Sequence, residues 1–515
     1  MANIVPAQLS TPYLLGGLIV LYLGYKIVNL VRINARINKL GARAPLRKSY
    51  APLGLDIAYE VVSHALKDKS YEMWVQMFNK WAGPGRYTIE AGIGERVILT
   101  AEPENIKAIL ATQFKDYGKG EQFRKDWHRF LGNGIFTTDG TLWHNSRQLI
   151  RPQFIKDRLS DIDIFETHTQ ILLSKISGGQ ATDTMDMMFR YTLDAATHFL
   201  LGVSVDSLEN PQTKFADAFG NAQRVQSIIA RVGPLNWAVP RKRMGFYDSI
   251  DTINDFVSTF IDRALALSPE ELNEKSNHDS GYTFLHAIAG YTRDRQMLRD
   301  QLVSVLLAGR DTTACTLTWA IYHLSLSPSI FAKLRQEIID TVGLTEKPTY
   351  QHLKDMKYLQ HVLNETLRLY PVVPYNVRMA LKDTTLPTGG GPNGDQPIGI
   401  LAGTPIGYST LVMQRRADLY PGPETGFADP THFVPERWNS WTPKSWTYIP
   451  FNGGPRICIG QQFALTEMGY TLVRLLQRFS GIENLMEDEH PGLHADIVLQ
   501  PAHEVKVRFV EGKSG

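Results

Sequence analysis

The residues with the clearest potential for chemistry surround Cys458, in the segment FNGGPRICIG at residues 451–460. The chain holds only two cysteines, so it cannot supply the several side-chain ligands that a zinc site needs. A haem iron needs one thiolate, because the porphyrin occupies four positions. A helical apolar run at 463–476 follows, and a helix N-terminus favours the thiolate over the thiol. A lone cysteine is more often a small buried hydrophobe, but its neighbours here suit a flat cofactor: Phe451, Gly453, Arg456 and Gly460.

A second candidate is the middle of the longest helical pattern, residues 298–327, which ends before Pro328. Residues 308–313 read Ala-Gly-Arg-Asp-Thr-Thr, an unusual helix interior because Gly, Asp and Thr are weak helix formers. Local weakening of a helix makes room for dioxygen and water beside a cofactor. An exposed polar patch would explain Asp311, but it would not explain Gly309 between apolar flanks.

A third candidate is a charged pair, Glu365 and Arg368, three positions apart in the predicted helix at residues 353–370. Such a pair usually lies on a solvated surface and contributes roughly 0.2–0.5 kcal/mol. The flanking residues are apolar enough for a buried helix, and Arg437 in the later segment PERW supplies a second arginine. We therefore expect a structural role for these charges.

The pattern F-x-x-G-x-R-x-C-x-G resembles the haem-binding loop of the cytochrome P-450 superfamily. The resemblance implies that Cys458 is the axial ligand of the haem iron, and that Asp311 and Thr312 are an acid–alcohol pair that delivers protons to dioxygen. It also implies a buried network beneath the haem, formed by Glu365, Arg368 and Arg437. The family's W-x-x-x-R motif matches Trp143 and Arg147, which with Arg378 and Arg456 would bind the haem propionates.

Three segments together resemble the fungal branch that hydroxylates n-alkanes and fatty acids: AGRDTTA, LPTGGGP and FNGGPRICIGQQFA. This implies hydroxylation of long chains at or near the terminal methyl. Related animal enzymes carry a glutamate at the position of Ala308 and bind haem covalently, so haem b should here be held without an ester. We expect the substrate pocket to be lined by apolar residues, namely Val303, Leu307, Ala308, Val372 and Val373.

Two alternatives stay open at this point. The chain could be a monooxygenase that tailors a secondary metabolite, because substrate loops vary freely on one fold. It could also be a haem protein that binds or senses a ligand without turnover, although proton delivery by Asp311 and Thr312 would then be unnecessary.

The remaining patterns predict mainly helices between residues 100 and 370. A hairpin is expected at 86–90 and 96–100, further strands after Pro374, and two more at 497–500 and 505–510. We expect residues 387–397 to be a loop between two strands. The fold class is therefore mainly α with a small β portion, as in the cytochrome P-450 fold, with one catalytic domain over residues 45–515.

The first 44 residues differ from the rest. Residues 13–25 carry no charge and continue into a mostly apolar stretch that reaches residue 31. No Asp or Glu precedes Asp56, whereas seven Lys or Arg do. Positive charge after the apolar run predicts a transmembrane signal anchor rather than a cleaved signal peptide. The expected location is the endoplasmic reticulum membrane, single-pass, with the catalytic domain in the cytosol. The alternative is an apolar helix that docks on the protein.

Electrons must come from a partner, because the sequence shows no flavin or nicotinamide fingerprint. The expected donors are NADPH-cytochrome P-450 reductase and, second, cytochrome b5, with O2 and a hydrophobic small molecule as substrates. No nucleic-acid partner is expected. A positive surface for an acidic flavoprotein is predicted from the basic residues Arg124, Lys125, His128, Arg129 and Arg151.

Overall fold

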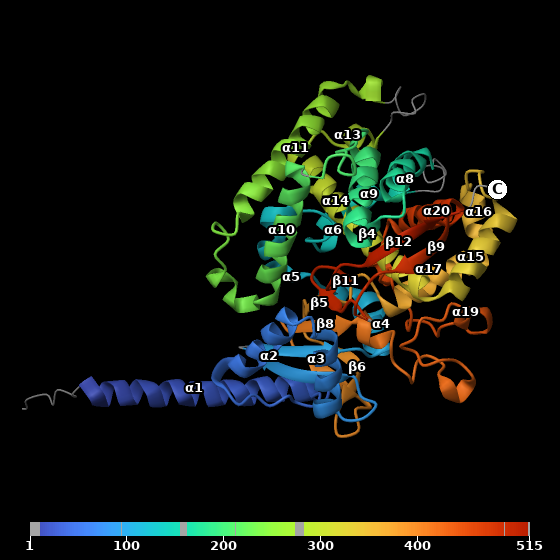
Figure 1. The fold of residues 1–515 in the computed structure, drawn as a ribbon. Coiled ribbons are helices and arrows are strands. Elements are labelled where there is room, and N and C mark those ends of the chain that lie inside the picture. Colours follow the sequence, from blue (N-terminus) through green and yellow to red (C-terminus); the bar gives the residue numbers. More distant parts are fainter. Residues whose placement is uncertain are drawn as a thin grey trace, which may run out of the picture.

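The computed structural model describes residues 11–93, 95–154, 162–211, 213–272, 283–488 and 490–512. Helices dominate it and surround the long central helix α14 (Arg295–Leu326) (Figure 1). The prediction of a mainly α fold is confirmed. The other helices are α1 (Thr11–Leu40), α2 (Leu55–Leu66), α3 (Ser70–Met77), α4 (Pro103–Lys107), α5 (Gly120–Leu131), α6 (Gly140–Ile150), α8 (Asp163–Ile176), α9 (Thr184–Leu201), α10 (Lys214–Arg231), α11 (Phe246–Ala266), α13 (Phe284–Tyr291), α15 (Pro328–Thr341), α16 (Tyr350–Asp355), α17 (Lys357–Leu369), α18 (Thr410–Met413), α19 (Arg437–Ser440) and α20 (Gln461–Arg478).

The strands form four small sheets within the described part of the chain. The largest has the order β1-β2-β8-β5-β3 and contains β1 (Thr88–Ile93), β2 (Glu95–Thr100), β3 (Tyr117–Gly118), β5 (Tyr375–Ala380) and β8 (Pro405–Ser409). Only the β2–β8 pair in this sheet is parallel. The others are β4-β12-β9, β6-β7 and β10-β11, with β4 (Ala181–Asp183), β6 (Thr384–Gly390), β7 (Gln396–Ile400), β9 (Phe479–Asn484), β10 (Leu493–Ala495), β11 (Leu499–Pro501) and β12 (Lys506–Glu511).

Several predicted boundaries need correction. The hairpin at 86–100 is confirmed as β1 and β2, but the helix expected at 353–370 is two helices, α16 and α17. They separate at Met356, whose ψ of 96° is extended, and α16 has its own capping box at Thr349. The loop expected at 387–397 is shorter, because β6 continues to Gly390. Near the C-terminus, Ile497 lies outside β11, and β10 was not predicted.

The long helix α14 is central to the fold, and almost none of its surface is exposed to solvent. Its N-terminus is capped by Asp294, whose carboxylate accepts hydrogen bonds from two backbone N–H groups. Its second half packs into one hydrophobic cluster with α8, α9, α17 and α20, and its first half packs into another with α10, α11 and α13. A third cluster fills the space between α3 and the five-stranded sheet. Buried on nearly all sides, α14 can present a few polar residues to an enclosed site.

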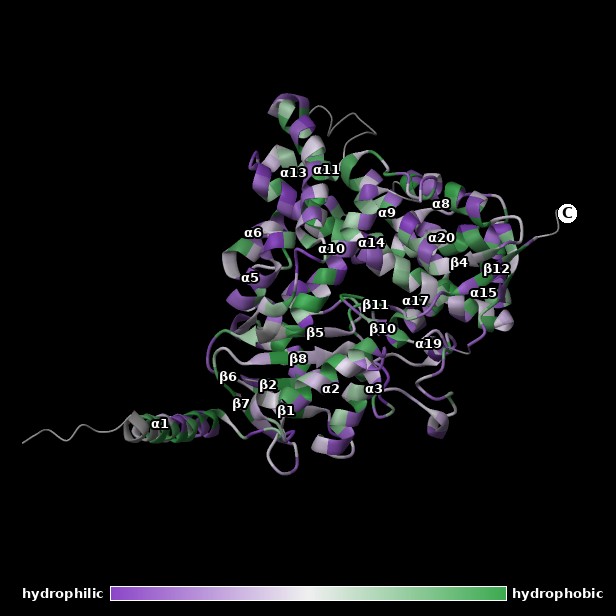
Figure 2. Cartoon of the chain, turned by 60° about the vertical axis from the view of Figure 1, so that its left-hand side comes forward, coloured by the Kyte–Doolittle hydropathy of each residue, from purple (hydrophilic) through white to green (hydrophobic). Residues whose placement is uncertain are grey.

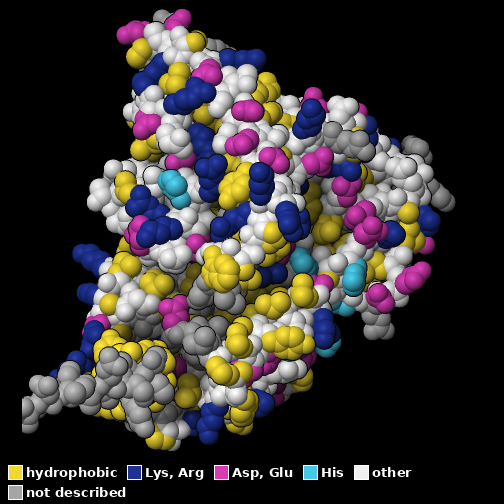
Figure 3. Space-filling view, turned by 90° about the vertical axis from the view of Figure 1, so that its left-hand side faces the viewer, with side chains coloured by type: hydrophobic (Ala, Val, Ile, Leu, Met, Phe, Trp, Pro, Cys, Tyr) yellow, Lys and Arg dark blue, Asp and Glu magenta, His cyan; other side chains and the backbone are white. Residues whose placement is uncertain are grey.

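The N-terminal helix α1 projects away from the rest of the molecule (Figures 1 and 2). Residues Gly17–Leu40 are long and apolar enough to cross a membrane. The helix extends past the predicted apolar run to Leu40, where its end meets the catalytic domain. Ile37 is fully buried, Arg36 Nη2 lies 2.8 Å from Asp383 Oδ2, and the N–H of Ala42 donates to the carbonyl of Pro397 beside β7 at 2.8 Å. On the face from which α1 projects, hydrophobic side chains gather in the lower part (Figure 3).

Candidate active site

The Cys458 loop lies between a short 3-10 turn, η8 (Gly454–Arg456), and helix α20. The N–H of Cys458 donates to the carbonyl of Phe451 at 3.0 Å, which closes the loop. Gly454 has a left-handed φ of 64°, and a Cβ atom at this position would collide with the carbonyl oxygen of Leu110. At Gly453 a Cβ atom would overlap the ring of Trp446. Two of the predicted glycines are therefore required by close packing of the loop itself.

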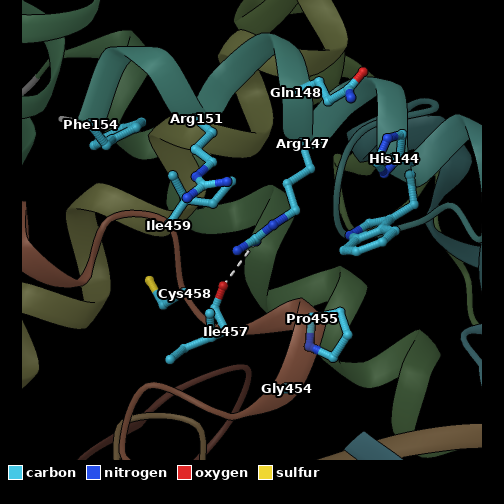
Figure 4. Close-up of a pocket in the computed structure, with 11 residues that line it drawn as sticks. His144, Arg147, Gln148, Arg151, Phe154, Gly454, Pro455, Ile457, Cys458 and Ile459 are labelled. Atoms are coloured by element: carbon cyan, nitrogen blue, oxygen red, sulfur yellow. Dashed lines mark hydrogen bonds between the residues drawn. The ribbon is translucent and has the colours of Figure 1, made fainter. Parts of the chain in front are cut away.

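A cavity of about 720 Å³ opens beside the Cys458 thiol. Its lining comes from α6, the turn that follows it and the cysteine loop (Figure 4): Trp143, His144, Arg147, Gln148, Arg151, Phe154, Gly454, Pro455, Ile457, Cys458 and Ile459. Arg147 Nη1 donates to the carbonyl of Ile457 at 3.0 Å across this space. Burial raises the pKa of the Cys458 thiol, while the Gly460 N–H and Arg147 act in the opposite direction. The thiol is thus accessible from the cavity and faces groups that favour its anion.

Next to this cavity the structure gathers cations that the sequence scatters over 337 positions, from Lys119 to Arg456. Arg456 Nη2 donates to Asp139 Oδ1 at 2.6 Å, and its guanidinium lies 4.7 Å from the centre of the Trp143 ring. Arg378 is 3% exposed and donates through Nη1 to the Asn376 side-chain oxygen at 2.9 Å. The ammonium of Lys119 shares that oxygen, at 3.3 Å.

Positive charge in this cluster exceeds negative charge. Among the described residues, Asp139 is the only carboxylate that pairs with any of these three cations, and it pairs with Arg456 alone. It already accepts hydrogen bonds from two backbone N–H groups. Burial, and after it the neighbouring Arg378, lower the pKa of Arg456 to about 10. Burial, then Arg378 and Arg456, hold the pKa of Lys119 well below its usual range. Burying cations without counter-ions is costly, so this cluster fits a ligand with two carboxylates beside Cys458, as haem has.

Lys119 was missed by sequence reasoning. A lysine between Gly118 and Gly120 carries no motif, and only its position opposite Arg378 and Arg456 shows its relevance. Trp143, Arg147, Arg378 and Arg456, all predicted as propionate partners, do lie in this one region.

The centre of α14 presents Ala308, Gly309, Arg310 and Thr312 as partly exposed residues, whereas most of the helix around them is buried. The Thr312 hydroxyl donates to the Ala308 carbonyl at 2.6 Å. Asp311 points elsewhere, because neighbouring helix positions are about 100° apart. Its carboxylate is 5% exposed and lies 3.4 Å from Arg310 Nη1. Burial raises the pKa of Asp311, although Arg310 and Gln223 of α10 oppose the shift.

Of the expected pocket residues, Val303 needs a correction. It has no exposed surface and packs in the cluster between α14, α10 and α11. Position 303 is about 140° around the helix from Ala308, whereas Thr312 is one turn from it. Leu307 is 8% exposed and belongs to the same cluster. Val372 packs with Cys315, Leu367 and Val498, whereas Val373 is 40% exposed.

The structure joins Glu365, Arg368 and Arg437 in one network whose side chains are all 0% exposed. Arg368 donates to both carboxylate oxygens of Glu365 at 2.8 Å, and Arg437 Nε lies 3.5 Å from Oε1. The indole N–H of Trp438 and the backbone N–H of Val434 donate to the same carboxylate at 2.9 and 3.1 Å. The network therefore ties α17 to the segment before the cysteine loop.

The basic run expected to meet a redox partner is only partly free. Arg124 and Lys125 both lie within 4 Å of the Glu121 carboxylate on α5, at 3.8 and 3.9 Å. Arg129 packs over Tyr247. Arg151 instead lines the cavity beside Cys458, so it does not belong to the basic surface of α5.

The chain is similar to known proteins over nearly its whole length. A family model for cytochrome P450 matches residues 61–509. The cytochrome P450 monooxygenase pvhE of Talaromyces variabilis is 48% identical, over 99% of this chain and 98% of that protein. Cytochrome P450 52E1 of Candida apicola is 40% identical over 98% of both chains, and cytochrome P450 52A12 of Debaryomyces hansenii is 38% identical over 96% of both.

Proposed function

This chain belongs to the cytochrome P450 family of haem-thiolate monooxygenases, and we propose that it hydroxylates long-chain fatty acids or n-alkanes at or near the terminal methyl group. Such enzymes use O2, electrons from a redox partner and a hydrophobic substrate. The observation that carries the haem-dependent part of the proposal is the cation-rich cluster of Arg378, Arg456 and Lys119 beside the Cys458 thiol. Its excess positive charge fits the two propionates of haem b, and Ala308 offers no carboxylate for a covalent bond.

The bound haem would supply the oxidation chemistry that splits dioxygen and inserts one oxygen atom into a C–H bond. Cys458 would hold the iron. Burial raises the pKa of its thiol, and the Gly460 N–H and Arg147 oppose this rise. The predicted network of Glu365, Arg368 and Arg437 would hold the cysteine loop in place by packing and hydrogen bonds, without contacting the substrate.

Proton delivery would fall to two residues on different faces of α14. The buried Asp311 carboxyl has a raised pKa, so it holds a proton more readily than an exposed aspartic acid. The Thr312 residue is partly exposed, but its hydroxyl donates to the Ala308 carbonyl, so it must rotate to donate into the site. Because the two side chains diverge, we propose that water carries the proton between them.

Substrate choice rests on the motifs shared with fungal alkane and fatty-acid hydroxylases and on the predicted apolar lining by Leu307, Ala308, Val372 and Val373. Attack on the strong terminal C–H bond requires a channel that keeps weaker internal positions away from the iron. Val373, which is exposed next to the buried Val372, is the proposed narrowing residue. We expect Val373→Ala to shift hydroxylation inward along the chain.

We further propose that α1 is a single-pass anchor in the endoplasmic reticulum membrane, with the catalytic domain in the cytosol. NADPH-cytochrome P-450 reductase would be the main electron donor, and cytochrome b5 a second one. The contacts of Arg36, Ile37 and Ala42 with the catalytic domain favour a boundary earlier than residue 44. Deletion of residues 1–35 should release a folded protein from membranes, whereas deletion of residues 1–44 should also lower its thermal stability.

The deciding experiment is incubation of the reconstituted enzyme with NADPH, a fungal reductase and either dodecanoate or hexadecane, followed by mass spectrometry. Terminal and near-terminal alcohols are the expected products. The absence of any hydroxylated chain, together with turnover of a bulky ring system, would move the protein to the tailoring of secondary metabolites.

A further inference from the structure

An ionic cluster joins three elements that lie far apart in the sequence: the end of α10, the connection between β10 and β11, and the segment after α2. Asp496 is its centre. Arg231 Nη2 donates to Asp496 Oδ1 at 2.5 Å, and the Ser227 hydroxyl donates to the same oxygen at 3.0 Å. The His494 ring bridges two carboxylates, with Nε2 at 3.1 Å from Asp496 Oδ2 and Nδ1 at 2.5 Å from Asp68 Oδ1.

Two of the elements that this cluster joins also contact predicted site residues. The N–H of Leu499 donates to the carbonyl of Val372 at 2.8 Å, and Val498 packs against Val372 and Cys315. The loop that carries Asp496 is thereby fixed beside the proposed pocket wall. From there Asp496 reaches α10, the helix whose Gln223 faces Asp311 one turn before Ser227. Figures 1 and 2 both place the β10–β11 hairpin between α10 and the α2–α3 pair.

Asp68 takes part in the cluster from the turn that ends α2. Asp68 has a left-handed φ of 56°, an uncommon backbone conformation for a residue other than glycine. Such a conformation persists when surrounding contacts favour it. Here the turn that ends α2 favours it, because the N–H groups of Asp68 and Lys69 donate to the carbonyls of Ala65 and His64 at 3.3 and 2.8 Å. The Asp68 side chain is thereby placed to pair with His494, which connects the segment after α2 to the hairpin.

We propose that Arg231, Asp496, His494 and Asp68 form a clasp that closes the roof of the substrate site and limits the rate at which bulky molecules enter and leave. Ser227 is a further member. The residues of the clasp act by holding structural elements together, because none of them borders Cys458 or Thr312. It holds α10 to the hairpin loop, so α10 must separate from Asp496 for the roof to open. The inference rests on the proposed function only in placing the substrate beneath this roof.

The clasp should weaken as pH rises. The charged groups that face the His494 ring are Asp496 on its own hairpin, Asp68 on the segment after α2 and, across Asp496, Arg231 on α10. Hydrogen bonds to Asp496 and Asp68 raise the pKa of His494. His494 therefore stabilises the closed state fully at pH values below its open-state pKa. This stabilisation is lost as the pH rises through the higher pKa of the closed state. Entry should therefore accelerate above about pH 6.5, the ordinary value for imidazole.

The test uses full-length haem-loaded protein and the variant Asp496→Asn, with Glu483→Gln as the matched control. Glu483 pairs with Arg508 at 2.6 Å between β9 and β12, away from α10. The probe is clotrimazole, a bulky azole whose nitrogen binds haem iron and changes its absorbance, mixed by stopped flow. Asp496→Asn should bind and release it about five-fold faster, the ratio expected for loss of roughly one ion pair. The control should match the parent protein.

Hydrogen exchange provides a readout that needs no ligand. In Asp496→Asn, and more weakly in Asp68→Asn, amide exchange should increase at the end of α10 and in β10–β11, and nowhere in α17 or α20. In His494→Gln the rise of the entry rate with pH should disappear. Parent-like exchange and parent-like entry in both Asp variants would overturn the clasp. If exchange increases but no fatty acid or alkane is hydroxylated, the clasp stands and the proposed substrate fails.

Discussion

Two buried clusters of charged residues in this protein differ in whether their charges are paired within the protein. In the network around Glu365, one carboxylate receives four neighbours, and the remaining guanidinium N–H groups of Arg368 and Arg437 reach backbone carbonyls, including those of Gln414 and Ala428. In the cluster of Lys119, Arg378 and Arg456, only Arg456 pairs with a carboxylate, that of Asp139, while Lys119 and Arg378 bond the amide oxygen of Asn376. The first is closed by the protein alone, whereas the second is balanced only when a dianionic ligand is bound. The difference separates residues that hold the fold from residues that hold the cofactor.

Breaking the closed network should have the largest effect. Glu365→Gln leaves Arg368 and Arg437 buried without a carboxylate, so the free energy of unfolding should fall by about 3–5 kcal/mol. Thermal unfolding and haem content of the purified protein measure this. Glu483→Gln, which breaks an exposed pair, should cost about 0–1 kcal/mol. A Glu365→Gln protein as stable as that control would contradict the structural role.

Removing the Cys458 thiol, which belongs to neither cluster, should abolish the haem-thiolate signature. Cys458→Ala should lose the red-shifted Soret band of the ferrous carbon monoxide complex, because no other thiolate lies on the cavity lining. The fold should persist, as circular dichroism would show. Cys315→Ala, which alters a fully buried cysteine, is the control and should keep the band. A red-shifted band in Cys458→Ala would refute the ligand assignment.

Neutralising one member of the incomplete cluster should affect cofactor affinity rather than folding. Lys119→Met should weaken haem binding about ten- to hundred-fold, the equivalent of one lost hydrogen bond to a charged group. The haem-free protein should be no less stable, because a buried, poorly compensated cation has been removed. Haem titration and thermal unfolding of both forms measure this, with the exposed Lys125→Met as control. An equal loss of stability in the haem-free protein would make Lys119 structural.

A hydroxyl outside both clusters should have the smallest effect on structure. Thr312→Ala should leave haem content and thermal stability unchanged but divert electrons from product to hydrogen peroxide, because only a proton donor is lost. Product and peroxide per NADPH consumed measure this. Thr312→Ser should restore the yield. Thr316→Ala, one turn along α14, serves as the control, and a parent-like yield in Thr312→Ala would exclude the relay.

The helical class, the β1–β2 hairpin and the long central helix were predictable from local patterns. They depend on contacts between neighbouring residues: an uninterrupted apolar run, an N-cap and a turn rich in glycine. The division between α16 and α17 was missed because the apolar spacing continues across Met356, although Thr349 and His352 form a capping box that signals a new helix. Val303 was expected in the pocket because it is close to Ala308 along α14, but it lies about 140° around the helix from Ala308 and has no exposed surface.

The sequence by itself determined which residue types could do chemistry: one cysteine in a glycine-rich loop, an aspartate and a threonine inside a helix, and arginines in recognisable motifs. Their spacing along the chain carries that information because each motif is local. Tertiary structure alone decided which charges meet. Lys119 joins Arg378 and Arg456, and Asp68 joins His494, Asp496 and Arg231, across separations of more than 100 residues. The energy of a buried charge depends on its spatial neighbours, and no local pattern records them.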